Sequence, residues 1–153
     1  MARFQFRLQQ FLGIKEQIED QKELEYAKAL RKVEEEKARL SELYAQRESA
    51  IEGLRNSLKK AIAPIDIRRY NNSIERLKEY IKVQIERLAA AEAFAEGKRQ
   101  ELVQAMKERK ALEIVKENSR EEFLREADLT ERKQVDELVS FKYTDKLQVA
   151  SHK

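Results

Sequence analysis

The sequence predicts an all-α protein: a long antiparallel two-helix coiled coil whose second helix is longer than the first. Only 3 Gly and 1 Pro occur in 153 residues, which leaves few places for turns. Charged residues make up 40% and aromatic residues 7% of the chain, as is typical of long helices. The apolar residues recur at alternating steps of three and four, which favours a seam between helices over a broad core.

The first helix is expected over about residues 4–61, and its seam is imperfect. Upstream, the apolar residues keep to one face only if the heptad phase slips between Ile18 and Tyr26. Polar residues at seam positions fix register at some cost in stability, and their long side chains can reach solvent. The expected seam residues of this helix are Leu30, Val33, Lys37, Leu40, Tyr44, Arg47, Ile51, Leu54 and Leu58.

A turn is expected at about residues 62–65. Proline costs about 3 kcal/mol inside a helix but suits its first turn, so Pro64 marks a new helix start. Asp66 then lies near the positive end of that helix dipole, and Lys59 and Lys60 suit the negative end of the preceding helix. The sequence therefore predicts that one helix stops, the chain turns, and a second helix begins.

The second helix is expected over about residues 65–141, followed by a frayed tail at 142–153. A short connection makes two long helices antiparallel neighbours, and a turn centred near residue 63 brings Phe4 close to Phe123. The expected seam residues are Ile67, Tyr70, Ile74, Leu77, Ile81, Gln84, Leu88, Ala91 and Ala95, continuing to Leu102, Ala105 and Leu112.

The unequal helices leave the end of the second one, roughly four turns, without an intrachain partner. An uncovered apolar stripe on a soluble protein usually marks a protein contact. Its residues are Leu124, Leu129, Val135, Leu138, Val139 and Phe141. Aromatic residues gather at the same end: Phe4, Phe6, Phe11, Phe123, Phe141 and Tyr143. Capping of the coiled coil, or self-association, is the alternative use of these side chains.

No catalytic, cofactor or metal site is expected. The chain has no cysteine, and its one histidine, His152, falls in the tail without neighbours at ligand spacing. Its glycines are isolated, so no phosphate-binding loop forms. The pI is near 9.0, but 32 basic residues face 29 acidic ones without an evident basic stripe, so no nucleic acid is expected as a partner. Neither a signal peptide nor a membrane span is expected.

Four segments carry a resemblance to a known family. They are Phe4-x-Phe6-Arg7-Leu8-Gln9, Gln17-Ile18-Glu19-Asp20, Ile67-Arg68-Arg69-Tyr70 and Glu131-Arg132-Lys133-Gln134-Val135-Asp136-Glu137. Their order and positions resemble the flagellar export protein FliJ family. That resemblance implies a non-enzymatic, stalk-like coiled coil of the flagellar type III export apparatus. It also implies a cytoplasmic protein associated peripherally, through that apparatus, with the inner face of the cell membrane.

The resemblance further implies partners and the residues that contact them. The partners are the hexameric export ATPase and its regulator, the cytoplasmic domain of the export gate, and export chaperones, with no small-molecule substrate. The ATPase contact is expected at the two termini, on Phe4, Phe6, Leu8, Lys133, Asp136, Leu138 and Phe141. The gate contact is expected on Leu43, Tyr44, Tyr70, Ile74, Leu77 and Ile81, several of which the periodicity also assigns to the seam.

Three other functions stay open on the sequence. A homodimeric coiled-coil tether would share the composition, although Pro64 interrupts the single continuous helix that it requires. The stalk protein of a virulence-type secretion system and a rotary-ATPase subunit would share both composition and layout.

Overall fold

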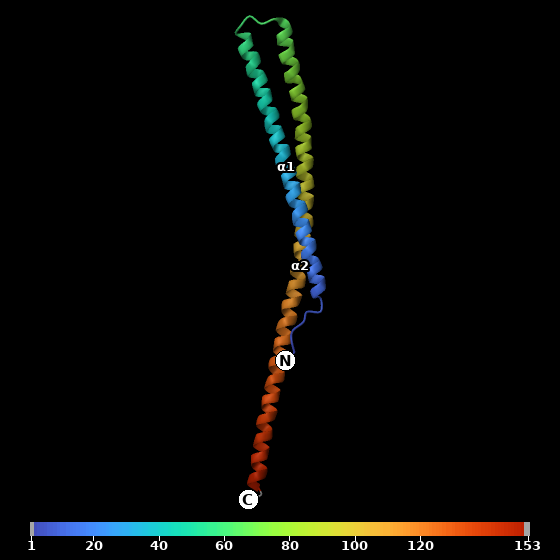
Figure 1. Ribbon diagram of the computed structural model, residues 1–153, viewed down its shortest axis with the longest axis vertical. Coiled ribbons are helices and arrows are strands. Elements are labelled where there is room, and N and C mark those ends of the chain that lie inside the picture. The colour runs from blue at the N-terminus through green and yellow to red at the C-terminus, as the bar shows by residue number, and fades with distance from the viewer. Residues whose placement is uncertain (1, 152–153) are drawn as a thin grey trace. The chain divides into compact units, whose positions relative to one another are not determined.

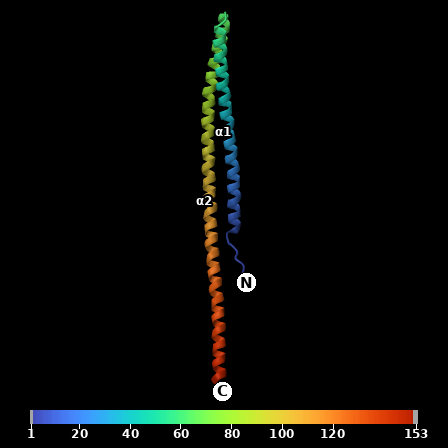
Figure 2. The ribbon, with the colours of Figure 1, turned by 90° about the vertical axis from the view of Figure 1, so that its left-hand side faces the viewer.

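The computed structural model describes residues 2–151 and forms a helical hairpin whose second helix is the longer. Helix α1 spans Gln9–Leu58 and helix α2 spans Pro64–Ser151, joined by residues 59–63 (Figure 1). The two views, turned by 90°, agree that α1 and α2 lie side by side and run in opposite directions (Figure 2). The predicted fold class is confirmed.

Both helices have bounds that differ from those expected. Residues 2–8 are not in α1, and the Gln9 amide donates to the Phe6 carbonyl at 3.1 Å where the helix begins. At the turn, the Lys60 amide donates to the Ser57 carbonyl at 3.1 Å, and α2 begins at Pro64. Residues 142–151, expected as a frayed tail, are helical, since they contain neither Gly nor Pro. His152 lies outside the described residues.

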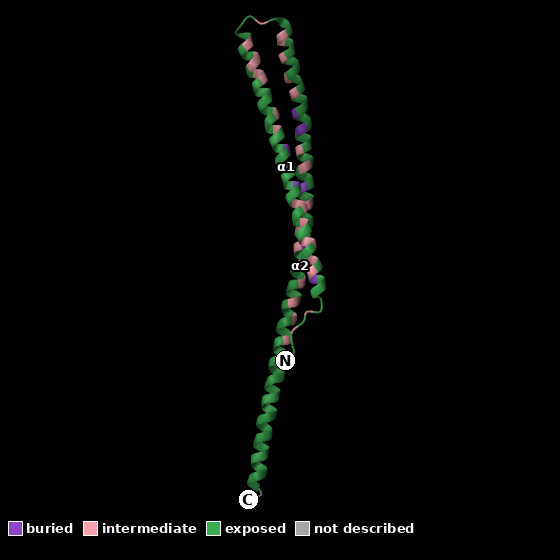
Figure 3. Cartoon of the chain, in the orientation of Figure 1, coloured by how far each residue is buried: buried purple, intermediate pink, exposed green. Residues whose placement is uncertain are grey.

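The seam expected on α2 is confirmed. Its residues recur at alternating steps of three and four from Ile67 to Phe123, and every one of these positions is buried or half-buried (Figure 3). Ile81, Gln84, Ala95 and Ala105 are the buried members. Thus Pro64 sets the start of the helix and the heptad pattern sets the face that it buries.

The seam expected on α1 is half wrong. Val33, Leu40, Ile51 and Leu54 are buried or half-buried as expected, but Leu30, Arg47 and Leu58 are exposed. The positions one residue earlier take the second place in each heptad: Ala29, Glu36, Leu43, Ala50 and Ser57. Lys37 and Tyr44 are exposed for the same reason. No phase slip occurs, because the same steps run unbroken from Leu12 through Tyr26.

The chain divides into two compact units, described separately below. The turn unit holds Ile18–Met106, and the terminal unit holds Met1–Gln17 with Lys107–Lys153. The core of the turn unit is a narrow cluster of Ala29, Val33 and Ala95, with Leu88 and Ala91 packed against it. Two of its three buried residues are alanines, so the burial of large apolar side chains contributes little here.

A buried polar pair also crosses the seam of the turn unit. The Gln84 side chain, 2% exposed, donates through Nε2 to the Glu36 carbonyl oxygen at 3.1 Å and to the Glu36 carboxylate. Lys32 forms an ion pair with the same carboxylate at 3.0 Å. Hydrogen bonds from Lys32 and then from Gln84 outweigh burial, so the pKa of Glu36 is lowered. Such a pair sets the register of a coiled coil at a cost in stability.

The Gln84→Leu variant is expected to be less stable than the wild type, because it leaves buried acceptors of Glu36 without their amide donor. The Glu36→Leu/Gln84→Leu double variant is expected to recover or exceed wild-type stability. Urea unfolding followed by circular dichroism measures both. If the single variant is as stable as the double, the amide contributes nothing to the fold.

Gly97 and Gly53 make a matched pair for a second test of the packing. A Cβ at Gly97 would meet nothing within 4 Å, whereas one at Gly53 would lie 3.2 Å from Cε1 of Tyr70. Gly97→Ala is therefore expected to stabilise the protein by about 0.5–1 kcal/mol through helix propensity. Gly53→Ala should gain less or lose stability in the same urea titration. Equal gains would show that Tyr70 does not pack against Gly53.

Candidate functional site

The end of α2 in the terminal unit is uncovered. Phe123 is the last half-buried residue of this helix, and every residue from 124 to 151 is exposed (Figure 3). At 1.5 Å per residue this uncovered segment (residues 124–151) is about 42 Å of helix. It extends ten residues beyond the predicted end of the helix, so the expected mismatch between the helices is larger than the sequence indicated.

The N-terminal segment packs against α2 as far as Phe123. The rings of Phe4 and Phe123 lie 5.6 Å apart between centroids and are tilted by 47°, which confirms the expected proximity of these two residues. Phe6 is half-buried and lines a concavity of about 490 Å³ with Leu8 and Val115. Phe4 and Phe123 therefore cap the coiled coil, which is the alternative use that the sequence left open for the terminal aromatic residues.

Other terminal aromatics are not part of that cap. Phe141 is 72% exposed, Tyr143 is 66% exposed and Phe11 is 55% exposed. A phenylalanine held this far in water forgoes most of the stabilisation that its burial would supply. In the described part of the terminal unit, Phe141 and Tyr143 thus remain candidates for contact with another molecule.

The uncovered segment does not continue the seam. The next six positions in the seam phase are polar: Glu126, Thr130, Lys133, Glu137, Ser140 and Thr144. The large apolar residues lie on several other faces of the helix, with Leu124, Val135, Leu138 and Val149 opposite the seam and Leu129, Phe141 and Tyr143 beside it. The expectation of a single stripe is therefore wrong, and more than one face of this helix offers apolar contacts.

The seven residues expected to contact an ATPase fall into two groups. Phe4, Phe6 and Leu8 lie in the N-terminal segment, where the two phenylalanines are half-buried and Leu8 is 41% exposed. Lys133, Asp136, Leu138 and Phe141 lie on the uncovered segment, and all are exposed. Leu138 is fifteen residues beyond Phe123, about 22 Å along the helix, so the two groups do not form one cluster.

Comparison with known proteins identifies the family. The family model described as flagellar FliJ protein matches residues 4–148, almost the whole chain. The chain belongs to the FliJ family. A solved structure described as that of a YscO homolog, CT670 of Chlamydia trachomatis, shares the fold with a TM-score of 0.69 and 23% identity, covering 95% of this chain and 99% of that one. A search among curated proteins finds no match.

Membership of the FliJ family supports a role as a component of a type III export apparatus, with partners in that apparatus. No helix among the described residues is long and apolar enough to cross a membrane. The described residues also contain no cluster of three or more His, Cys, Asp or Glu side chains that could hold a metal ion.

The residues that the FliJ resemblance assigns to the export gate lie mostly in the seam of the turn unit. Ile81 is 7% exposed, and Tyr70, Ile74, Leu77 and Leu43 are half-buried. Tyr44 alone of the six is exposed, at 41%. Their contact with the gate remains a prediction, and a partner would reach only the edges of these seam side chains without separating the helices.

Two apolar residues that the sequence analysis did not single out lie near this seam. Tyr80 is 57% exposed and Val83 is 45% exposed, and with Leu43 they line a concavity of about 430 Å³. Arg39, Gln84 and Arg87 complete its wall. The signal for them was available, because an apolar residue directly beside a seam position widens the apolar face of the helix.

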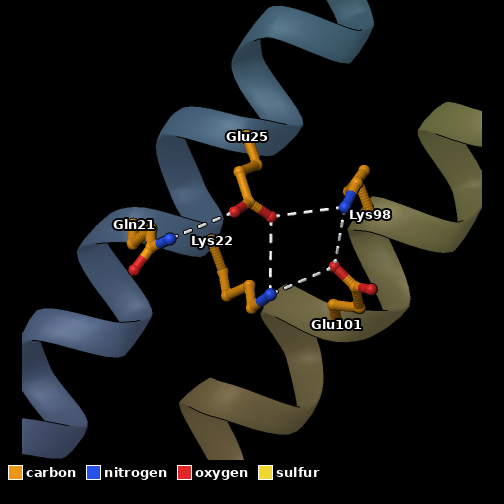
Figure 4. Close-up of polar contacts among 5 residues, drawn as sticks. All are labelled: Gln21, Lys22, Glu25, Lys98 and Glu101. Atoms are coloured by element: carbon orange, nitrogen blue, oxygen red, sulfur yellow. Dashed lines mark hydrogen bonds and ion pairs between the residues drawn. The ribbon is translucent and has the colours of Figure 1, made fainter.

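A ring of four charged residues joins the two helices of the turn unit (Figure 4). Lys22 lies 3.4 Å from both Glu25 and Glu101, while Lys98 lies 3.4 Å from Glu25 and 3.3 Å from Glu101. Gln21 adds a hydrogen bond of 3.3 Å to Glu25. Each charge therefore meets two opposite ones, one on its own helix and one across the seam.

The ring shifts the pKa of three of its members. A hydrogen bond to Lys98 lowers the pKa of Glu101, and hydrogen bonds to Glu101 and Glu25 raise the pKa of Lys98. For Glu25, desolvation is the largest single effect and raises the pKa, but Lys98 and Lys22 together outweigh it, so its pKa is lowered. The charged forms of Glu25 and Glu101 therefore stabilise the folded state.

The ring should make stability depend on pH in a defined direction. Carboxylates whose pKa is lowered lose their contribution as pH falls below the ordinary value of 4.5, and Lys98 loses its own as pH rises beyond 10.5. Lys98→Met should therefore be less stable than the wild type at neutral pH. That difference should shrink at both extremes when urea midpoints are measured against pH, and a difference independent of pH contradicts the electrostatic assignment.

Proposed function

We propose that this chain is the stalk-like component of a flagellar type III export apparatus, which binds the hexameric export ATPase through the uncovered segment of α2. The observation that carries the proposal is an ordered helix with apolar side chains on several faces and no intrachain partner. A helix that is apolar on more than one face is suited to being surrounded by protein. The central opening of a hexameric ring offers such an enclosure.

The charged residues of the same segment support this role. Lys133 and Asp136 are exposed, and neither forms an ion pair with a described residue, so they are available to orient the helix against charges of a partner. Apolar contacts would supply most of the affinity, since exposed charge pairs contribute little. In this proposal nucleotide hydrolysis belongs to the ATPase, and the chain raises it by promoting ring assembly without acting as an enzyme.

Coupling to the export gate and to export chaperones is the second part of the proposal. The exposed Tyr44 and the neighbouring concavity lined by Leu43, Tyr80 and Val83 are the surfaces of the turn unit that could receive a gate segment. A gate contact would associate the protein peripherally with the inner face of the membrane, from the cytoplasm. Contact by the whole seam would require α1 and α2 to separate.

A virulence-type secretion apparatus is the second candidate, favoured by the shared fold with the YscO homolog of Chlamydia trachomatis. The family model that matches residues 4–148 describes the flagellar protein, and for that reason the flagellar apparatus comes first. Pull-down with a flagellar and with a virulence-type export ATPase separates the two candidates. Capture of the virulence ATPase alone would reverse their order.

Truncation after Ala127 should abolish stimulation of the flagellar ATPase and leave the hairpin folded. The described residues that the cut removes, 128–151, are all exposed, so the two helices should unfold at the same urea concentration as in the full chain. ATP hydrolysis and ring formation by electron microscopy measure the first effect, and circular dichroism measures the second. Full stimulation by the truncated chain, or none by the intact one, contradicts the proposal.

A matched pair of substitutions tests the apolar contact itself. Leu138, 60% exposed, lies on the uncovered segment, and Leu24, 64% exposed, lies in the turn unit. Leu138→Ser is expected to weaken ATPase binding by roughly tenfold or more, as for a central interface residue worth above 1 kcal/mol. Leu24→Ser should bind like the wild type in the same titration. Equal losses would place the contact elsewhere.

A further inference from the structure

The hairpin tip (residues 58–70) carries the net charge of the whole chain. Lys59 and Lys60 precede the turn, Arg68 and Arg69 follow it, and Asp66 is the one acidic residue, which gives +3. The complete chain also carries +3 at pH 7, so the basic and acidic residues outside the tip balance. The excess positive charge is therefore concentrated at one place in the fold.

The turn brings the two basic pairs together. Lys60 and Arg69 line a single concavity of about 720 Å³, together with Ile62 and Asp66. All four basic side chains are exposed, and none of them forms an ion pair with a described residue. Nearby, by contrast, Arg55 is paired with Glu52 at 3.4 Å. The tip cations thus keep their charge available to a ligand.

Apolar side chains stand beside these cations. Leu58 is 56% exposed and Ile65 is 60% exposed, one before the turn and one after it. Basic residues interspersed with exposed aliphatic ones are typical of protein segments that lie at a lipid–water interface. There the cations meet phosphate groups while the aliphatic side chains enter the boundary of the acyl chains.

We propose that the hairpin tip binds the surface of an anionic phospholipid membrane. Its four cations contact lipid phosphates, and Leu58 and Ile65 enter the interface. This contact is additional to the proposed role in export and does not depend on it. A lipid surface needs no specific pocket, and the four cations around the turn reach the lower limit of the basic clusters that are typical of anionic-lipid binding.

The alternative of an acidic protein segment fits the tip less well. Asp66 lines the concavity together with Lys60 and Arg69, so an acidic side chain that enters it meets a like charge as well as two opposite ones. Leu58 and Ile65, the most exposed large apolar residues of the tip, do not line that concavity and offer no groove to a peptide. Both side chains are exposed and can instead enter a lipid interface.

Flotation of the full chain with vesicles tests the proposal. The chain is expected to float with vesicles of phosphatidylcholine and phosphatidylglycerol, and to stay behind with phosphatidylcholine alone. Each tip cation should contribute about fivefold to the affinity at low salt. The tip variant replaces Lys59, Lys60, Arg68 and Arg69 by Gln, and the control variant replaces Lys28, Arg31, Arg76 and Lys78 by Gln.

The two variants have the same net charge, and the control residues are exposed and free of described ion pairs. The tip variant should lose roughly a hundredfold or more in vesicle affinity, whereas the control should retain most of it. Circular dichroism establishes that both are folded. Equal losses by the two variants, or unchanged binding by the tip variant, would overturn the proposal, as would a wild type that floats with neither vesicle.

A fluorescent probe tests insertion separately from charge. The chain has no tryptophan, so Ile65→Trp and Leu24→Trp each introduce a single tryptophan at a similarly exposed site. With anionic vesicles, emission from Ile65→Trp should shift to the blue and be quenched by brominated acyl chains, while Leu24→Trp stays unchanged. An unquenched Ile65→Trp places the tip off the membrane, and capture of an acidic protein would then replace the lipid surface.

Discussion

The five-residue connection between Leu58 and Pro64 fixes the pairing of the two helices, and much of the structure depends on it. Within the turn unit, Gly53 meets Tyr70 and Glu25 meets Lys98, while in the terminal unit Lys15 meets Glu108 at 3.0 Å. Residue numbers in each of these pairs have the same sum, so the helices pair in the same antiparallel register within each unit. Because the register is fixed and α2 is longer than α1, the end of α2 is left uncovered regardless of which side chains it carries.

The seam buries few large apolar side chains, so the polar contacts that cross it matter more for the pairing of the two helices. The buried apolar residues among those described are Leu12, Ala29, Val33, Ile81, Ala95 and Ala105. Three of these are alanines, whose burial contributes less than that of leucine or isoleucine. A seam of small residues could also pair one heptad out of register, since the next heptad offers similar shapes. The Glu36–Gln84 pair and the charged ring oppose such slippage, because a shifted register would separate their partners.

Sequence reasoning predicted the helices, the α2 seam and the Phe4–Phe123 contact, because each follows from spacing along one chain. It failed on α1, where two neighbouring heptad columns both contain apolar residues. Leu30, Tyr44 and Leu58 are larger than Ala29 and Ser57, so the sequence pattern assigned the seam to the heptad positions with the larger side chains, which are exposed. Close approach of two helices prefers the smaller residues, and only the partner helix reveals this. The charge at the hairpin tip was missed for a similar reason, since Lys60 and Arg69 become neighbours only after the chain has turned.

The uncovered segment keeps its helical form without a partner for a physical reason. Starting a helix in water is costly, but extending one that already exists adds a hydrogen bond for each residue fixed. The part of α2 that packs against α1 supplies that start. Ion pairs on the helix surface, such as Arg132 with Asp128 at 3.3 Å, add a small amount of helix stability. A partner therefore meets a helix that is already formed and does not have to order it. Because the seam phase is polar from Glu126 to Thr144, a third helix laid along that line would meet mostly polar side chains before it reaches Leu147. The apolar side chains on the other faces can be covered without displacing α1 from its seam, so binding at this end adds to the stability of the hairpin instead of competing with it.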